Sequence, residues 1–362
     1  SYIKKDSVSA SIEPGEEIVF TSRLNPLKGT GTFSGYERFL SREGFCASTY
    51  INSHQWEKSD SPPVKQLSYL ALKYRKKLSK LFEDSVISTK ARPILFAMTL
   101  GAVELLDKET KENFSVAGVS HLLAVSGLNV GILIWLLNIL LYGMNRYEKS
   151  RIAKEFILLL SIWIYAFITG LSPSVVRAVI MFSIVILGHT LHRKINIYHS
   201  LLLSAFGMLL YNPYYLFNIS FQLSYTALFS IVCFQPPING LIRIKNRVVK
   251  YFWEIANVSI AAQICTFPLI LYYFHSFPTH FIVTNIMLVP LSFLLLGIVI
   301  LSYMTLLIPF AGKFFLIAAG IIGDFFHSTT AFIHNLPYAV WQITTMNILE
   351  VILLYTILFF FS

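Results

Sequence analysis

Charge is scarce in this chain. Only 13% of its 362 residues are Asp, Glu, Lys or Arg, whereas soluble globular proteins carry about 25%. Hydrophobic residues make up 55%. From about residue 119 onward the chain consists of apolar stretches, several of which reach the roughly 20 residues that a helix needs to cross a bilayer core. This composition excludes an ordinary soluble protein, and we expect a polytopic α-helical membrane protein.

Cysteine and catalytic motifs are equally scarce. Cys46, Cys233 and Cys265 lie far apart without metal-ligand spacing, so neither a disulfide framework nor a zinc site is expected. The H-E-x-x-H, G-x-S-x-G and Walker patterns are absent from the sequence. Residues 119–362 hold five acids, too few and too scattered for a two-metal nuclease. We therefore expect no enzyme activity, no metal and no cofactor.

The charges divide the chain into two parts. Residues 1–118 contain 17 Lys and Arg against 14 Asp and Glu, whereas residues 119–362 contain 12 against 5. The first third is therefore a soluble or surface-lying region, and the rest is membrane. The net charge of +10 suits a nucleic-acid partner, but most of the excess lies in the membrane part, where basic loops set topology.

The first part is expected to hold a β-domain followed by surface helices. Residues 1–60 alternate apolar and polar positions between Gly and Pro turns, which predicts a small β-domain. Because the chain starts at Ser1 instead of Met, we expect a fragment with an incomplete β-domain. We assign residues 61–112 to amphipathic interfacial helices. Their basic stretch 64–82 is typical of a helix on a membrane surface, or of a charged helix packed on its own domain.

Apolar stretches in residues 113–362 give nine candidate spans, at 119–142, 155–171, 173–191, 195–212, 214–235, 251–275, 281–308, 312–334 and 346–361. Lys and Arg follow the first, third, fifth and seventh spans, while the loops near 172, 213, 278 and 340 contain neither. Under the positive-inside rule these four loops and the N-terminal region lie outside. The stretches 195–212 and 251–275 are either spans or re-entrant segments.

A polar group interrupts the first candidate span. Gly127 and Gly131 form a small-xxx-small pair that lets a second helix approach closely, and Ser126 and Asn129 can hydrogen-bond across such a contact. The group is therefore either a helix-packing seam or a polar lining. His121, near the end of the span, is more typical of an interfacial histidine than of a catalyst.

The third span starts with a proline and contains an arginine. Pro173 follows Ser172 at a helix start, where its missing N–H costs nothing. Arg177 lies one turn later, inside the span, so its side chain should face protein or water rather than lipid. The alternatives are an arginine that snorkels to the outer interface and a cationic fork that lines a path for anions.

Two further groups are less specific. Phe221, Gln222 and Tyr225 belong to an aromatic stretch that either stacks on nucleobases or packs against other helices. Asp324 and His327, three residues apart, share a helix face and suit a proton relay or a buried pair.

Five segments in order carry a resemblance: "FSGYERFLSREGFCASTYI" (33–51), "FAMTLGAVELL" (96–106), "GVSHLLAVSGLNVGIL" (118–133), "TGLSPSVVRAVIM" (169–181) and "NPYYLFNISFQLSYTA" (212–227). Together they resemble the ComEC family of competence proteins, across most of the chain. The resemblance implies a periplasmic OB-like β-domain in residues 1–60 and a competence transmembrane domain in residues 113–362, in the bacterial inner membrane.

The resemblance also implies a function. A ComEC-like chain would act in natural transformation as a DNA-uptake channel that passes single-stranded DNA into the cytoplasm, with a periplasmic DNA-delivery protein and a cytoplasmic DNA motor as partners. Arg177 and the basic helix would contact phosphates. The remaining residues of the DNA path would be Ser126, Asn129, Phe221, Gln222, Tyr225 and His121, while Gly127, Gly131 and Pro173 would be structural.

Two departures from the family pattern and two alternatives complete the sequence interpretation. The family commonly has His at the position of Asn129, and many members carry a C-terminal metallo-β-lactamase-like domain, whereas this sequence ends in an apolar stretch. A nuclease role is therefore not carried over. A secondary transporter for a small anionic solute predicts internal repeats, and the sequence shows no convincing one. An intramembrane hydrolase predicts that His121, Ser126 or Asp324 converge.

Overall fold

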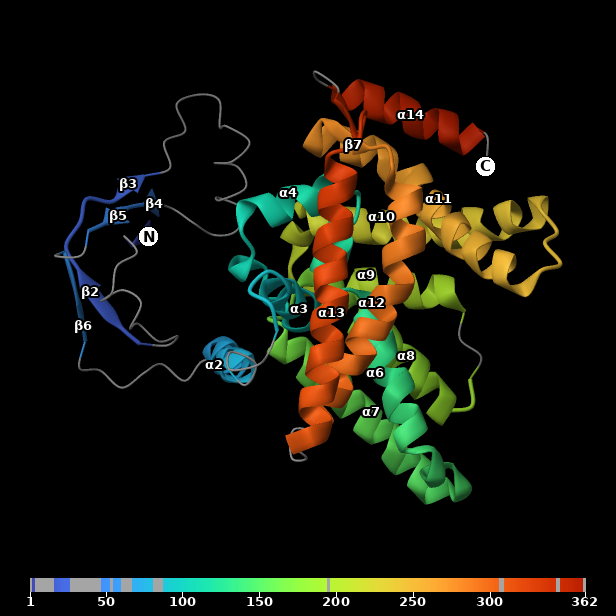
Figure 1. Ribbon diagram of the computed structural model, residues 1–362, viewed down its shortest axis with the longest axis horizontal. Coiled ribbons are helices and arrows are strands. Elements are labelled where there is room, and N and C mark those ends of the chain that lie inside the picture. Colours follow the sequence, from blue (N-terminus) through green and yellow to red (C-terminus); the bar gives the residue numbers. More distant parts are fainter. Residues whose placement is uncertain are drawn as a thin grey trace.

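The computed structural model describes residues 2–3, 16–26, 47–52, 55–59, 67–80, 87–193, 196–305, 309–342 and 346–360. The helices in this part are α2 (Leu67–Lys80), α3 (Ala91–Leu100), α4 (Lys108–Val116), α5 (Ser120–Leu123), α6 (Gly127–Leu140), α7 (Glu148–Ile168), α8 (Pro173–Thr190), α9 (Ile197–Tyr211), α10 (Ile219–Leu241), α11 (Arg247–Phe274), α12 (Phe281–Met304), α13 (Pro309–His334) and α14 (Ile348–Phe360). Short 3-10 turns are η2 (Val103–Leu105), η3 (Tyr142–Arg146) and η4 (Pro213–Phe217). In Figure 1, α12 and α13 run through the body of the bundle, and the paired α10 and α11 reach out to one side.

Short strands pair two by two in the N-terminal region. They are β1 (Tyr2–Ile3) with β5 (Tyr50–Ile51), β2 (Ile18–Phe20) with β6 (Trp56–Lys58), and β3 (Asn25–Pro26) with β4 (Ala47–Ser48). Residues 27–46, which hold most of the segment 33–51, lie outside the described residues. These ladders show β-structure in residues 1–60, and the OB-like topology stays a prediction.

Four helices of the described residues are long and apolar enough to cross a membrane. They are Pro173–Thr190, Arg247–Phe274, Phe281–Tyr303 and Gly312–His334, and they match the third, sixth, seventh and eighth predicted spans. Together they agree with the predicted multi-pass helical membrane protein. Other predicted spans differ in length or composition. α9 and α14 have 15 and 13 residues, α7 begins with five charged residues in its first eight, and the 23-residue α10 has no charged residue but contains two prolines.

The first predicted span, 119–142, is wrong as a single helix. α5 ends at Leu123 and α6 begins at Gly127, with extended backbone at Ala124 and Ser126 between them. Ser126 takes the N-cap position of α6, which a serine favours over a helix interior. With 14 residues, α6 is about 21 Å long, shorter than the roughly 30 Å hydrocarbon core of a bilayer.

The polar side of the stretch 251–275 faces a neighbouring helix. α11 runs unbroken over 28 residues, so this stretch is not re-entrant within the helix. Asn257 is fully buried and its amide donates to the Gln235 carbonyl of α10 at 3.2 Å. Ser230 of α10 donates to the Ala261 carbonyl and accepts from the Cys265 N–H at 3.2 Å. The Asn257 amide nitrogen and the backbone of α11 at Ala261 and Cys265 therefore pair with α10, whereas Glu254 and Gln263 have partners within α11.

Two apolar cores hold the bundle together. The larger core joins α3, α4, α5, α12 and α13, and Phe114, Leu295 and Phe326 are among its fully buried side chains. The smaller core joins α6, α7 and α8 through residues such as Ile162 and Val179. The C-terminal end of α3 links the two cores.

The C-terminal end of α3 is enclosed by other helices. Gly101 adopts a left-handed conformation (φ +73°), and two backbone N–H groups return to the carbonyls of Phe96 and Ala97. The next two carbonyls have side-chain donors: Asn129 Nδ2 of α6 to Met98 at 2.7 Å, and Tyr165 Oη of α7 to Thr99 at 3.0 Å. The four consecutive carbonyls from Phe96 to Thr99 therefore each accept a hydrogen bond at this end of α3.

The N-terminal end of α3 is held by α13. Ser88 Oγ accepts from the Ala91 N–H at 3.1 Å and donates to the Asp324 carboxylate. Of the ten residues of α3, eight are buried, so α3 is a core helix and not one of the interfacial helices predicted over 61–112. The reason is its composition: Arg92 is its one charged residue, so the helix has no polar face to present to water.

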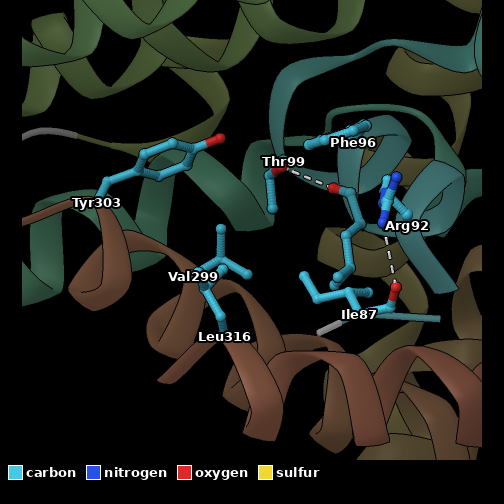
Figure 2. A pocket seen from close by; sticks show the side chains of 8 residues that line it. Ile87, Arg92, Phe96, Thr99, Val299, Tyr303 and Leu316 are labelled. Atoms are coloured by element: carbon cyan, nitrogen blue, oxygen red, sulfur yellow. Dashed lines mark hydrogen bonds between the residues drawn. The ribbon is translucent and has the colours of Figure 1, made fainter. Parts of the chain in front are cut away.

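The side of α3 that faces α12 and α13 is almost completely filled. A cavity of about 10 Å³ lies there, lined by residues that include Ile87, Arg92, Thr99 and Tyr303 (Figure 2). Arg92 Nη2 donates to the Ile87 carbonyl at 3.3 Å and Thr99 donates to the Leu95 carbonyl at 2.6 Å. This volume suffices for about one water molecule.

We expect Gly101→Ala to lower the free energy of unfolding by about 1–2 kcal/mol, because an L side chain is strained at positive φ and its Cβ would lie 3.0 Å from the Thr169 carbonyl oxygen. The matched control is Gly297→Ala inside α12, where nothing lies within 4 Å of the added Cβ; it should be neutral or stabilising by up to about 1 kcal/mol. Denaturant titration in detergent micelles measures both. Equal effects of the two substitutions would contradict the enclosed α3 end.

Candidate functional site

The two glycines of the interrupted segment face α8. A Cβ on Gly127 would lie 3.3 Å from the Cβ of Ala178 and 4.0 Å from Nη2 of Arg177. A Cβ on Gly131 would lie 3.5 Å from the Phe182 ring. Pro173 occupies the first turn of α8. The small residues of α6 thus let α8 approach closely enough to bring Arg177 beside the start of α6.

The polar residues of the same segment contact protein. Asn129 is 5% exposed, and its amide donates to the α3 carbonyl described above while its oxygen accepts from Ser126 Oγ at 3.2 Å. This arrangement favours the packing alternative for Asn129 over a lining role. His121 lies on α5 with its side chain exposed.

Arg177 lies inside the protein. The residue is 9% exposed, and its Nε and Nη1 atoms are buried without a hydrogen-bond partner among the described residues. No carboxylate oxygen in that part of the chain lies within 4.0 Å of its guanidinium. Burial of this kind argues against an arginine that snorkels along an exposed interface.

An aromatic group from α10 covers the guanidinium. The Arg177 Cζ lies 5.5 Å from the centroid of the Tyr225 ring, which is a cation–π contact. Phe221 contacts the same ring, with centroids 4.4 Å apart, and stacks on Tyr215 at 6.3 Å. The Tyr225 hydroxyl lies 3.0 Å from Ser204 Oγ of α9. We call Arg177, Phe221, Tyr225 and Ser204 the arginine site.

Gln222 points away from the arginine site. Its amide nitrogen donates to the Leu216 carbonyl at 2.8 Å and its oxygen accepts from the Tyr273 hydroxyl at 2.7 Å. Both ends of the amide therefore join η4 to α11. The structure brings Gly127, Arg177, Phe221 and Tyr225 together, and gives Gln222 other partners.

The arrangement suits anion binding better than acid–base catalysis. Ser126 contacts Asn129, and Asp324 contacts Ser88 at the other end of α3, so the side chains of the hydrolase alternative do not hydrogen-bond to each other. No group of three or more His, Cys, Asp and Glu side chains in the described residues could hold a metal ion. What remains is a desolvated cation with unused N–H donors, which is complementary to an oxyanion.

Sequence reasoning missed two supporting residues. Tyr165 and Ser204 lie in apolar helices with no local pattern around them, and their roles come from contacts with residues that are 66 and 21 positions away. A second cavity, of about 290 Å³, lies beside Tyr165 and is lined mainly by leucine and isoleucine from α6 and α7. Its lining offers few donors for a charged ligand.

We expect Tyr225→Leu to destabilise the protein more than Tyr225→Phe. The leucine variant loses a desolvated cation–π contact worth about 2 kcal/mol. The phenylalanine variant keeps the ring and loses the hydroxyl contacts to Ser204 Oγ and to the Met208 sulfur, of which the first is worth about 1 kcal/mol. Unfolding of both variants in detergent micelles provides the measurement. A phenylalanine variant as unstable as the leucine variant would show that the ring does not hold Arg177.

Comparison with known proteins places the chain in a family. A family model described as "Competence protein" matches residues 98–362. The chain is 31% identical over 282 residues to ComE operon protein 3 of Bacillus subtilis (strain 168), covering 77% of this chain and 34% of that protein. It is 27% identical over 252 residues to an uncharacterized protein of Aquifex aeolicus (strain VF5), covering 66% of this chain and 56% of that protein.

These relatives extend beyond the matched region. The chain spans about a third of the length of the first relative and slightly more than half of the second. No solved structure matches the chain. The family match covers α3 from Met98 through α14, which includes the arginine site, and the first relative is more than 30% identical. On this evidence the chain belongs to the ComEC family of competence proteins.

Proposed function

We propose that this chain forms the membrane channel part of a DNA-uptake protein and passes single-stranded DNA across the bacterial inner membrane during natural transformation. Family membership supports a role in competence. The observation that carries the proposal is Arg177, a buried guanidinium with two nitrogen atoms, Nε and Nη1, that lack a hydrogen-bond partner, and with no carboxylate within 4.0 Å among the described residues. Such a group binds the phosphates of a nucleic acid without regard to base sequence.

The aromatic part of the arginine site supports the same substrate. Phe221 and Tyr225 present ring faces beside the guanidinium. Aromatic rings stack on any base, so they suit a path that must accept every sequence. We propose that an incoming strand replaces the Tyr225 ring as the partner of Arg177, and that Tyr225 and Phe221 then face its bases. Ser126 and His121 complete the proposed path as polar groups at its edge.

The basic helix α2 lies near the same end of α8. Arg75 pairs with Glu104 after α3 and donates to the Gly101 carbonyl at 3.4 Å. Its Nη1 lies 3.9 Å from the Cβ position of Gly170, in the loop that leads to Pro173. Lys73 and Lys77 remain exposed on α2. We propose that α2 binds phosphates at the outer opening of the DNA path and that Arg75 keeps α2 in this position.

The contacts between loops support the proposed orientation. β7 (Ser276–Pro278) pairs with β8 (Val340–Gln342), which joins two loops that the charge pattern assigns to the outside. Arg151 contacts His192 at 3.1 Å, which joins two segments assigned to the inside. An arrangement in which successive loops lie on alternating sides of the membrane is thus compatible with the fold. In the proposal the N-terminal β-domain is periplasmic, a delivery protein supplies DNA there, and a motor protein receives it in the cytoplasm.

A secondary transporter for a small anion is the second candidate. Ser230 Oγ hydrogen-bonds to the backbone of α11 between Ala261 and Cys265, and Pro268, which has no N–H to donate, lies inside the same continuous helix. Interrupted helices are typical of transporter sites. In this protein α10 satisfies the opened groups of α11, so this observation carries less weight than Arg177.

We expect Arg177→Ala to reduce arrival of DNA in the cytoplasm by about 10-fold or more, because a charge-assisted hydrogen bond contributes about 1.5–3 kcal/mol. Outer uptake should not change. The assay follows labelled DNA in naturally competent cells that carry the full-length protein as their only copy, with membrane expression measured for each variant. Arg193→Ala, an exposed arginine at the other end of α8, is the control.

Normal arrival of DNA with Arg177→Ala at normal expression would contradict the path through the arginine site. A loss equal to that of Arg193→Ala would mean that general positive charge, and not the buried guanidinium, is required. Unimpaired DNA entry together with lost uptake of a small anion would favour the transporter.

A further inference from the structure

A second buried cation lies at the other end of the α6–α8 group. Lys154 of α7 is 5% exposed. Its ammonium donates to Asn145 Oδ1 of η3 at 3.0 Å. In the described part of the chain, no carboxylate oxygen lies within 4.0 Å of Nζ. An ammonium has three N–H donors, and the neutral Asn145 accepts from one of them.

Arg151 and His192 extend the same cluster. Arg151 lies one turn before Lys154 on α7, and residues three apart share a helix face. Its Nη2 lies 3.1 Å from Nε2 of His192, just after α8. Because a guanidinium can only donate, the imidazole Nε2 is the acceptor in this contact. The histidine therefore orients Arg151 without neutralising it.

Such a cluster is incomplete without an anion. A buried charge with no opposite charge is strongly destabilising, and a neutral amide offsets only part of the lost hydration of the ammonium. A carboxylate from this chain would pair with the buried cation, as Glu104 pairs with Arg75. Asn145 Oδ1 and His192 Nε2, which accept from Lys154 and Arg151, carry no negative charge, and among the described residues no carboxylate pairs with Lys154.

We propose that Lys154 and Arg151, with His192 orienting Arg151, form a binding site for a phosphate-class anion at the inner end of the bundle. A phosphate offers several oxygens to the two cations at once. α8 ends at Thr190, 13 residues and about 20 Å after Arg177, and His192 follows this end, so the new site lies at the opposite end of α8 from the arginine site. If the phosphate belongs to DNA, the inference rests on the proposed function and makes the cluster the exit contact of the strand.

The same chemistry has a second source, the headgroup of an anionic phospholipid, because the inner end of α7 and α8 lies where headgroups would be in the proposed orientation. The binding test uses the full-length protein in maltoside micelles, which contain no phosphate. The variants are Lys154→Gln and the control Lys149→Gln, a neighbouring lysine on the exposed side of α7. Glutamine keeps a donor toward Asn145, and a thermal melt checks folding.

The first probe is a dT20 oligonucleotide. Lys154→Gln should weaken its binding roughly tenfold and reduce the slope of log affinity against log salt by about 0.7, the value for one lost single-strand phosphate contact. The second probe is phosphatidylglycerol, scored by native mass spectrometry as lipid retained per protein. Loss of one retained lipid in Lys154→Gln, with dT20 binding unchanged, would assign the site to a headgroup.

Lys154→Gln matching Lys149→Gln with both probes would overturn the inference. If Lys154→Gln does not fold, Arg151→Gln tests the same cluster from a half-buried position, and the same two outcomes apply. The proposed function fails separately: it fails when Arg177→Ala leaves DNA entry normal, whereas a Lys154-dependent lipid would still support the anion site.

Discussion

The fold depends on satisfying the backbone of α3 inside an apolar interior. Both ends of this ten-residue helix lie within the bundle, so its first four N–H groups and its last four carbonyls have no partner within the helix. Neither lipid nor packed side chains supply water that could pair with these groups. Gly101, Asn129 and Tyr165 satisfy one end, while Ser88 and Asp324 secure the other. These contacts fix the positions of α6, α7 and α13 around α3.

The same contacts position the arginine site. Asn129 ties the first turn of α6 to α3, and the small side of α6 then determines how closely α8 approaches. The approach of α8 sets the position of Arg177, because it brings the guanidinium under the Tyr225 ring of α10. The polar residues of the interrupted segment thus act chiefly by holding the helices in position around Arg177. The guanidinium of Arg177 is the group that is chemically suited to phosphate.

Because the chain contains few charged residues, each buried cation has a large effect on the attraction of anions. Lys154 and Arg177 lie at opposite ends of the α7–α8 pair, and neither has a carboxylate partner in the described residues. In a low-dielectric interior such cations attract anions strongly. A DNA strand that passes Arg177 and Lys154 would exchange a phosphate contact with one cation for a phosphate contact with the other. This exchange requires that neither contact binds too tightly. The scarcity of acids is therefore consistent with passage of a polyanion.

The sequence by itself determined the membrane class and most helix positions, because composition and helical spacing are local properties. It also singled out Gly127 and Arg177, which the structure places side by side. It did not determine the break at Ser126, the burial of α3 or the partners of Asn129. Those depend on which carbonyls are left open by a helix more than 25 residues away. Only the tertiary structure decided which polar groups would pair with each other, and so left Arg177 and Lys154 as buried cations with no carboxylate partner among the residues that the structure describes.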